Sequence, residues 1–252
     1  MRDVTRADIC VVALAEAFRG DGELFASGMG TVPMIGARLA RASFEPDLLI
    51  SDGEAFFVAN DLAIGGTDKV VEGWIPFRSV FDTVWGGRRH VIMGASQIDA
   101  FGNENIANIG PWARPKAQLL GVRGGPGNTI NHATTYWVPR HTAKVFVPAV
   151  DMVSGIGYDR AAELSPWVQS HHDIRRVVSN LGVFDFATPD HRMRLVSVHP
   201  GSSVDEIVAN TGFELVIPDD VPGSRPPTDA ELALLHEVLD PTGLREKEVP
   251  AS

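Results

Sequence analysis

The order of apolar and polar residues predicts a helix at the start of the chain. Over residues 5–18, apolar side chains recur at the spacing that places them on one face of a helix. Thr5 and Asp8 stand three residues apart, as in a capping box, and Gly20 with Gly22 ends the segment. We therefore expect a helix that begins at a side-chain cap.

A strand, a glycine loop, a second helix and a second strand follow. Residues 23–27 are a short apolar run, residues 28–31 are a loop with two glycines, and Pro33 suits the first turn of a helix over 33–42. The apolar run at 47–51 completes a βαβ unit, in which the two strands are parallel. Ligands bind at the carboxyl ends of such strands, so the residues that follow them are candidates for chemistry.

The rest of the chain continues the alternation and becomes richer in strands. We expect helices over 76–85, 203–213 and 228–240, a strand over 89–99, and β-rich runs over 143–155, 175–186 and 193–201. The predicted fold class is α/β, with an open, mostly parallel sheet that is mixed in its later half. No linker or internal repeat divides residues 1–252, so we expect one domain with a short charged tail from about residue 245.

Composition narrows the class of protein. The 252 residues are 44% hydrophobic and 21% charged, which supplies enough apolar surface for a core. The formal net charge of -10 repels nucleic acid and anionic membranes, and no apolar run approaches the roughly 20 residues that cross a bilayer. Residues 1–8 lack the apolar region of a signal peptide, and the single cysteine, Cys10, excludes an internal disulfide. We expect a cytoplasmic protein that binds neither nucleic acid nor membrane.

An acidic segment follows the second strand of the βαβ unit. Apolar residues 48–50 end in Ser51, Asp52, Gly53 and Glu54. At the carboxyl end of a parallel strand these acids could carry chemistry, but Asp and Gly are also common turn formers. The pattern alone leaves both interpretations open.

Two polar stretches near strand ends are further candidates. Gly28 and Gly30 form either a tight turn or a cradle of backbone amides, without the third glycine of a dinucleotide fingerprint or the lysine of a P-loop. Residues 94–105 place Gly, Gln, Asp and Asn at another strand end. A hydrogen-bonded hairpin explains the later part of this stretch, and it explains Gly94 and Gln97 less well.

A third stretch, residues 121–134, contains four glycines. Its backbone amides could form an anion-binding nest beside Arg123 and Asn128, or it could be a flexible surface loop. His171 and His172 are adjacent in the sequence, so their side chains would lie on different faces of a helix or strand and would not form a metal site. We expect a surface loop at these two residues.

Several stretches together resemble a known family. SGMGTVPMIGARLA, EPDLLISDGE, GASQIDAFGNEN, GGPGN and PGSSVDEIVANTGFEL are similar to the β subunit of family I coenzyme A transferases, nearest to the glutaconate type. The similarity runs from about residue 5 to about residue 245. The resemblance implies helices on both faces of the sheet, a separate α subunit in an α2β2 heterotetramer or a higher multiple, and an active site at the interface of the two kinds of subunit.

The catalytic glutamate of that family is absent from the matching position. Family transferases use it to attack the acyl-CoA and form a glutamyl-CoA thioester. Aligning Gly53 with the family glycine puts Ser51 at the glutamate position, Asp52 next to it and Glu54 beyond the glycine. A shifted, shorter carboxylate would be misplaced, and an error near 1 Å costs on the order of 10²-fold in rate. The chain therefore departs from transfer chemistry.

The chain shares this departure with one subgroup, the steroid ring-cleaving hydrolases. GVRGGPGNTINHATTYW, DMVSGIGYD and RRVVSNLGVFDF are similar to their β subunits. The implied reaction is hydrolysis of a C–C bond in the last steroid ring: water adds to the ring ketone of a cyclic β-keto acyl-CoA, as in a retro-Claisen reaction. Coenzyme A is then part of the substrate, and no separate cofactor is implied.

The resemblance and the loops together give a candidate site. Ser51, Asp52 and Glu54 would be catalytic, with Asp52 positioning water or a ring oxygen, and Gly94 and Gln97 would donate to the thioester carbonyl. The other predicted substrate-binding residues are Gly28, Gly30, Thr31, Arg123 and Asn128. Two alternatives remain: a true CoA transferase that uses Asp52 or Glu54, and a silent subunit that only shapes the site of its partner.

Overall fold

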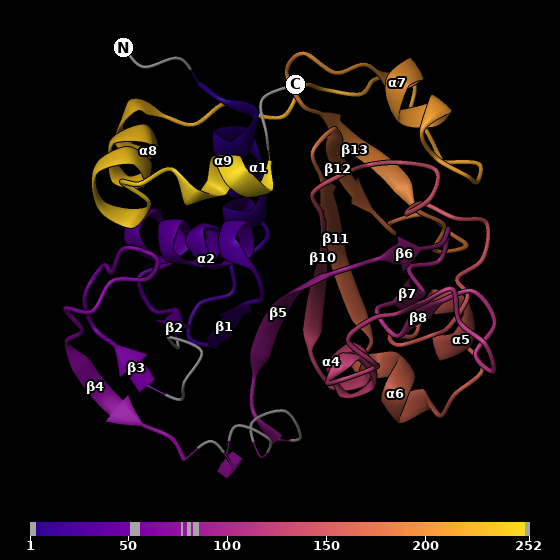
Figure 1. Ribbon diagram of the computed structural model, residues 1–252, viewed down its shortest axis with the longest axis horizontal. Coiled ribbons are helices and arrows are strands. Elements are labelled where there is room, and N and C mark those ends of the chain that lie inside the picture. The colour runs from indigo at the N-terminus through magenta and orange to yellow at the C-terminus, as the bar shows by residue number, and fades with distance from the viewer. Residues whose placement is uncertain (1–3, 51–55, 77, 80–81, 83–85, 250–252) are drawn as a thin grey trace. The chain divides into compact units, whose positions relative to one another are not determined.

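The computed structural model describes residues 4–50, 56–76, 78, 79, 82 and 86–249 (Figure 1). Contacts between residues divide the chain into two compact units, one of residues 1–93 with 225–252 and one of residues 94–224. The expectation of one domain stays a prediction.

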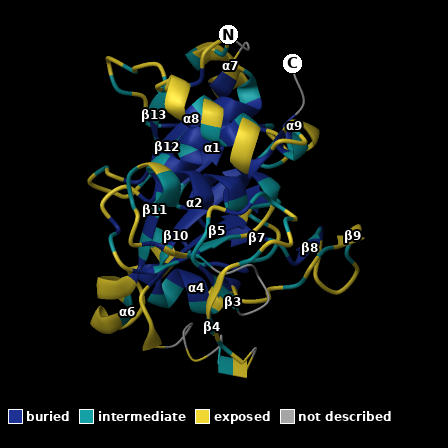
Figure 2. Ribbon diagram, turned by 90° about the vertical axis from the view of Figure 1, so that its left-hand side faces the viewer, coloured by how far each residue is buried: buried dark blue, intermediate teal, exposed yellow. Residues whose placement is uncertain are grey.

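The first unit combines helices with parallel strands and one antiparallel pair of strands. Its elements are α1 (Arg6–Glu16), β1 (Phe25–Gly28), α2 (Thr31–Ser43), β2 (Leu49–Ile50), β3 (Phe56–Val58), β4 (Val71–Trp74), β5 (Arg89–Gly94), α8 (Asp229–Ala233), the π-helix η1 (Leu234–Leu239) and α9 (Leu244–Glu248). Strand β1 pairs in parallel with both β2 and β5, which confirms the predicted βαβ unit. Helices α1 and α2 pack together and are largely buried (Figure 2). The predicted helix over 76–85 lies mostly outside the described residues.

The second unit combines parallel and antiparallel strands. Its elements are β6 (Gln97–Ile98), β7 (Glu104–Asn105), β8 (Asn108–Ile109), β9 (Ala117–Gln118), α4 (Gly125–Asn131), β10 (Ala133–Val138), α5 (Tyr158–Ala161), α6 (Pro166–His171), β11 (Asp173–Ser179), β12 (Gly182–Asp185), β13 (Arg194–Val198) and α7 (Val204–Ala209). Strand β10 pairs in parallel with β11, and β11, β12 and β13 follow one another antiparallel. The predicted mixture of parallel and antiparallel strands is confirmed.

The predicted capping box at Thr5 is confirmed at atomic detail. The Thr5 side chain accepts from the backbone of Asp8, and the Asp8 carboxylate accepts from the backbone of Thr5, so α1 begins with a complete capping box. Thr228 and Glu231 make the same reciprocal pair at α8. These caps satisfy amides that every helix leaves unpaired at its first turn.

The predicted β-rich run over 143–155 is wrong. Its described backbone turns at Thr142, whose carbonyl accepts from Val145 and Phe146, and forms only isolated bridges, at Phe146 and Gly155. Pro148 interrupts the run and has no N–H to donate to a neighbouring strand. Phe146 is nevertheless buried and stacks on His141, with ring centroids 3.7 Å apart. The apolar pattern therefore reports burial and not a strand.

The charged segment at the C-terminus is a packed helix and not an extended tail. Residues 244–248 form α9, which contacts α1 and α2. Its Arg245 side chain is only 1% exposed. The sequence shows the charges of this segment, but the buried partners of Arg245 are Asp8 and Asp240, which lie before it in the chain.

Candidate functional site

The predicted catalytic residues Ser51, Asp52 and Glu54 lie outside the described residues. Strand β2 ends at Ile50 and strand β3 begins at Phe56, so the described chain defines both sides of this segment. The catalytic roles of the three residues stay predictions.

Arg41 holds the two sides of this segment together. From the last turn of α2, its Nε donates to the carbonyl of Leu48 at 3.1 Å and its Nη1 donates to the carbonyl of Ala59 at 3.0 Å. Leu48 immediately precedes β2 and Ala59 immediately follows β3. A guanidinium group presents several donors in one plane, so one side chain can join two backbone segments.

A small pocket lies beside the end of β2. It is lined by Arg38, Arg41, Ile50, Val58, Asn60, Asp61 and Leu62. Arg41 Nη1 lies 3.9 Å from Asp61 Oδ1, and Arg38 is only 8% exposed. Two guanidinium groups and one carboxylate give the lining a net positive formal charge within an acidic chain. Our sequence analysis missed this pocket, although the three-residue spacing of Arg38 and Arg41 already placed them on one helix face.

Gly28 and Gly30 form the tight turn between β1 and α2. A Cβ atom on Gly28 would lie 2.5 Å from the carbonyl oxygen of Pro33, so a larger residue would collide with the first turn of α2. Gly30 has φ +114°, a conformation that favours glycine. Thr31 is the first residue of α2, and the next amide, of Val32, donates to Glu248 Oε2 at 3.2 Å. The predicted turn is confirmed. The Val32 amide, which belongs to the predicted cradle of backbone amides, already donates to a side chain of the same chain.

Gln97 is a hub of internal hydrogen bonds in the second unit. Its side chain donates to Asp151 Oδ2 at 2.9 Å and accepts from Asn105 Nδ2 at 2.7 Å and from the backbone of Asp151 at 3.0 Å. Gly94 has open space where a side chain would be. The geometry favours a structural role for Gln97, and donation by Gly94 and Gln97 to a thioester stays a prediction.

The polar residues that follow also hold the backbone. Asp99 accepts from the amides of Phe101 and Asn103 and from the Asn103 side chain, at 3.0, 3.0 and 2.9 Å. Asn103 donates in addition to Asp159 at 2.9 Å. Burial raises the pKa of Asp99 above its ordinary value, while these hydrogen bonds oppose the rise. The hairpin interpretation of this stretch is therefore confirmed.

Glu104 is the exception in this stretch, and our sequence analysis missed it. The residue is fully buried, and no hydrogen bond to its carboxylate oxygens is found among the described residues. The buried Tyr136 hydroxyl likewise has no hydrogen bond among the described residues. Both groups lie beside Gly155: a Cβ atom on this glycine would be 3.2 Å from Glu104 Oε2 and 2.9 Å from the Tyr136 hydroxyl. Burial raises the pKa of Glu104 to about 8, so its carboxyl is largely neutral at pH 7.

The glycine-rich stretch over 121–134 is partly helical, and its interpretation as an anion nest or a flexible loop stays a prediction. Its residues 125–131 form the short helix α4, with Gly124 as N-cap. Arg123 has φ 49° and donates to the carbonyl of Leu120 at 2.8 Å, and Asn128 is 1% exposed. Binding of substrate by Arg123 and Asn128 stays a prediction.

The prediction of a surface loop at the two histidines is wrong for His172. His171 ends α6 and is exposed, whereas His172 is buried and its Nδ1 lies 2.6 Å from the carbonyl oxygen of Thr129. Burial lowers the pKa of His172. Within the described residues, no group of three or more His, Cys, Asp or Glu side chains is arranged to hold a metal ion. None of the described helices is long and apolar enough to span a membrane.

The predicted site residues fall into two groups. Gly28, Gly30 and Thr31 belong to the first unit, as do the described neighbours of residues 51–54. Gly94, Gln97, Arg123 and Asn128 belong to the second unit. Each group is polar and rich in glycine, and the part of the chain that the structure describes contains no complete set of acid, base and nucleophile within either group.

Comparison with known proteins identifies the family. No family model matches the chain. The cholesterol ring-cleaving hydrolase IpdB subunit of Rhodococcus jostii is 55% identical over 247 residues, which cover 98% of this chain and 97% of that protein. The chain belongs to the IpdB subunit family.

Solved structures agree with this IpdB assignment. The crystal structure of Rhodococcus jostii IpdAB matches with a TM-score of 0.94 at 53% identity, covering 99% of this chain and 100% of that chain. Glutaconate coenzyme A-transferase from Acidaminococcus fermentans matches with a TM-score of 0.78 at 21% identity, covering 99% and 100%. The second likeness concerns the fold alone. The predicted fold class, a CoA-transferase-like α/β fold, and the predicted resemblance to a ring-cleaving hydrolase subunit are both confirmed.

Proposed function

We propose that this IpdB-family chain is the β subunit of a hydrolase that opens the last steroid ring of a cyclic β-keto acyl-CoA during cholesterol or steroid catabolism. The observation that carries the proposal is the 55% identity to the Rhodococcus jostii IpdB subunit over nearly the whole of both chains. Water adds to the ring ketone, and the ring C–C bond then breaks toward the carbon that the thioester stabilises. The product keeps its thioester to coenzyme A, so the reaction needs no further cofactor.

The chemistry requires a group that orients water and donors that stabilise the developing negative charge. We assign the first role to Asp52, next to Ser51 and Glu54, because this segment follows a parallel strand of the βαβ unit. The backbone amides of Gly28, Gly30, Thr31 and Gly94 and the side chains of Gln97, Arg123 and Asn128 are candidates for binding the thioester and the polar groups of the substrate. No metal ion takes part in this proposal.

The active enzyme is proposed to contain a separate α subunit, as an α2β2 heterotetramer. The related crystal structure carries the name IpdAB, which denotes two kinds of subunit. We place the complex in the cytoplasm, where a buried free thiol such as that of Cys10 stays reduced.

An assay of the chain with and without its α subunit tests this proposal. The isolated chain should not open the ring of a cyclic β-keto acyl-CoA, and the two-subunit complex should. Full turnover by the isolated chain would contradict the need for a partner. Failure of the complex to open any such ring would contradict the proposed reaction.

A true CoA transferase is the alternative, since the fold is shared with glutaconate coenzyme A-transferase. A free carboxylic acid added as acceptor separates the two functions. Only a transferase moves coenzyme A to the acceptor, and it does so through a glutamyl or aspartyl thioester on the chain. Borohydride and hydroxylamine trap such a thioester, so mass spectrometry of the peptide 45–57 would reveal a modified Asp52 or Glu54.

A further inference from the structure

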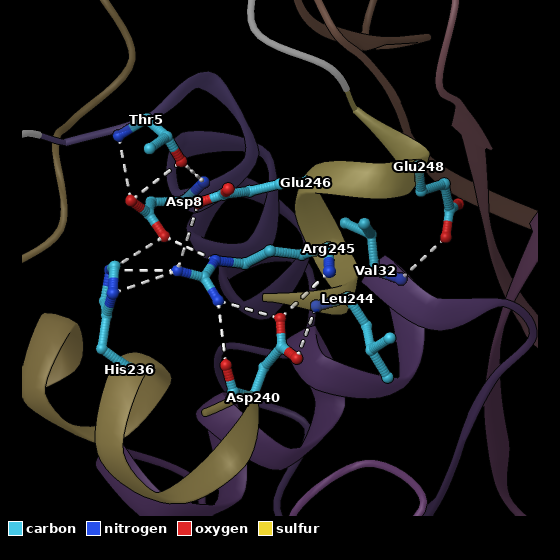
Figure 3. Close-up of polar contacts among 9 residues, drawn as sticks. All are labelled: Thr5, Asp8, Val32, His236, Asp240, Leu244, Arg245, Glu246 and Glu248. Atoms are coloured by element: carbon cyan, nitrogen blue, oxygen red, sulfur yellow. Dashed lines mark hydrogen bonds and ion pairs between the residues drawn. The ribbon is translucent and has the colours of Figure 1, made fainter. Parts of the chain in front are cut away.

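Helix α2 begins without a cap from its own turn. Its N-cap residue is Gly30, which has no side chain to accept from the amides of the first helical turn. The carboxylate of Glu248 fills this role from the other end of the sequence: Oε2 accepts from the Val32 amide at 3.2 Å (Figure 3). A Cβ on Gly30 would lie 3.7 Å from Glu248 Oε1. The carboxylate therefore lies directly over the turn that joins β1 to α2.

The position of Glu248 is fixed by buried ion pairs on the same helix. Arg245, one turn earlier in α9, is 1% exposed, and its Nε donates to Asp8 Oδ1 at 2.7 Å while Nη1 donates to Asp240 Oδ2 at 2.8 Å. Asp240 also accepts from the amide of Leu244 at 2.8 Å. Figure 3 shows these groups converging on the guanidinium. Fixed charges with several partners hold α9 in one place.

The ion pairs of Arg245 also connect α9 to α1, the first helix of the chain. The second oxygen of Asp8 accepts from the amide and the hydroxyl of Thr5, at 2.9 and 3.0 Å, as part of the capping box of α1. Arg245 is thus joined to an element whose own start is fixed. The helix that carries Glu248 cannot shift without breaking these buried contacts.

A carboxylate suits this place for two reasons. It accepts from an amide that would otherwise lack a partner within the helix, and its negative charge interacts favourably with the positive end of the helix dipole. The Val32 amide is consequently committed to Glu248 and is not the amide that a ligand would use. The turn residues Gly28, Gly30 and Thr31 immediately precede this contact.

We propose that Glu248 is a positioning residue for the reaction: from α9 it fixes the turn over residues 28–31, which borders the acyl-CoA. The inference rests on the proposed function, because it assigns that turn to the substrate site. Loss of the carboxylate leaves the turn in place as a connection but lets its backbone sample other conformations.

The test uses the two-subunit complex with Glu248→Ala, Glu248→Gln and the control Lys247→Ala, an exposed charged side chain of the same helix. Glu248→Ala should speed hydrogen exchange of the amides in residues 29–34 and lower kcat roughly tenfold or more, since misplacement near the site is costly. Glu248→Gln keeps an oxygen acceptor and should recover most of kcat. Lys247→Ala should leave both readouts unchanged.

Two results would overturn the proposal. One is unchanged hydrogen exchange in residues 29–34 of Glu248→Ala, which would mean that the contact does not fix the turn. The other is faster exchange with unchanged kcat and KM, which would mean that the turn does not serve the reaction. If the wild-type complex has no ring-opening activity, the proposed function fails, and the exchange experiment still decides whether Glu248 fixes the turn.

Discussion

At the scale of single residues, Asp52 separates the catalytic from the structural interpretation of its segment. If Asp52 only forms a turn, Asp52→Ala should cost about 1 kcal/mol of folding free energy and leave kcat unchanged. If it positions water, the substitution should lower kcat by roughly 10²-fold or more with little change in stability. We predict the second result, measured by steady-state kinetics and urea unfolding of the same complex. An unchanged kcat with a lowered unfolding midpoint would support the turn.

Glu104 makes a separate prediction about pH. Its folded-state pKa of about 8 lies above the ordinary value of 4.5, so between these pH values the folded chain holds a proton that the unfolded chain has lost. Stability should therefore fall as pH rises through this window and level off above pH 8. Glu104→Gln resembles the protonated acid and does not titrate, so the wild type should lose stability relative to this variant as pH rises.

Urea midpoints of both proteins at several pH values between 5 and 9 measure this difference. Glu214→Gln is the control, because the Glu214 side chain is 86% exposed and its substitution leaves the buried carboxyl of Glu104 in place. Parallel stability curves for the wild type and Glu104→Gln would contradict a neutral buried carboxyl. The environment of Glu104 is made by Tyr136 and Gly155, which are distant in sequence, so local pattern could not identify it.

At the scale of elements, α9 depends on one buried cation. Arg245→Met would remove the guanidinium that pairs with the buried carboxylates of Asp8 and Asp240, and breaking a buried ion pair typically costs about 3–5 kcal/mol. Arg192→Met is the control, because Arg192 pairs with the exposed Glu214 and such pairs contribute about 0–1 kcal/mol. Urea unfolding measures both. Equal effects of the two substitutions would contradict the role of Arg245 as an anchor.

The turn between β1 and α2 makes a second prediction about an element. Gly28→Ala places a Cβ against the backbone of Pro33 and should destabilise the first unit by about 1–3 kcal/mol, whereas Gly94→Ala meets open space and should change stability by less than about 1 kcal/mol. The unfolding midpoints of the two variants give the comparison. A neutral Gly28→Ala would mean that the turn tolerates a shift of α2.

The elements also show which features a sequence can predict. The caps at Thr5 and Thr228 use partners three residues away, so the local pattern was sufficient. The apolar pattern around Phe146 predicts a strand, but Pro148 and long-range packing make these residues a buried loop. The partner of Arg245 at Asp8 is 237 residues away, which no spacing rule could find.

At the scale of the whole molecule, the family and fold class were predictable because several motifs occur together along nearly the whole chain. The same motifs were less informative about chemistry. Most hydrogen bonds of the polar stretch join residues of this chain, as at Gln97, Asp99 and Asn103. The same residues are therefore as typical of a hairpin as of a substrate-binding site. The absence of a glutamate at Ser51 remains the feature of the sequence that points away from coenzyme A transfer.

The central claim is that this chain and its α subunit open a ring by hydrolysis without moving coenzyme A. The most direct test incubates the complex with a cyclic β-keto acyl-CoA and an excess of a free carboxylic acid, and measures the masses of all coenzyme A esters over time. We predict a product heavier than the substrate by one water, with its thioester intact and no ester of the added acid. Formation of the acceptor's coenzyme A ester, with the ring of the substrate unopened, would contradict the account.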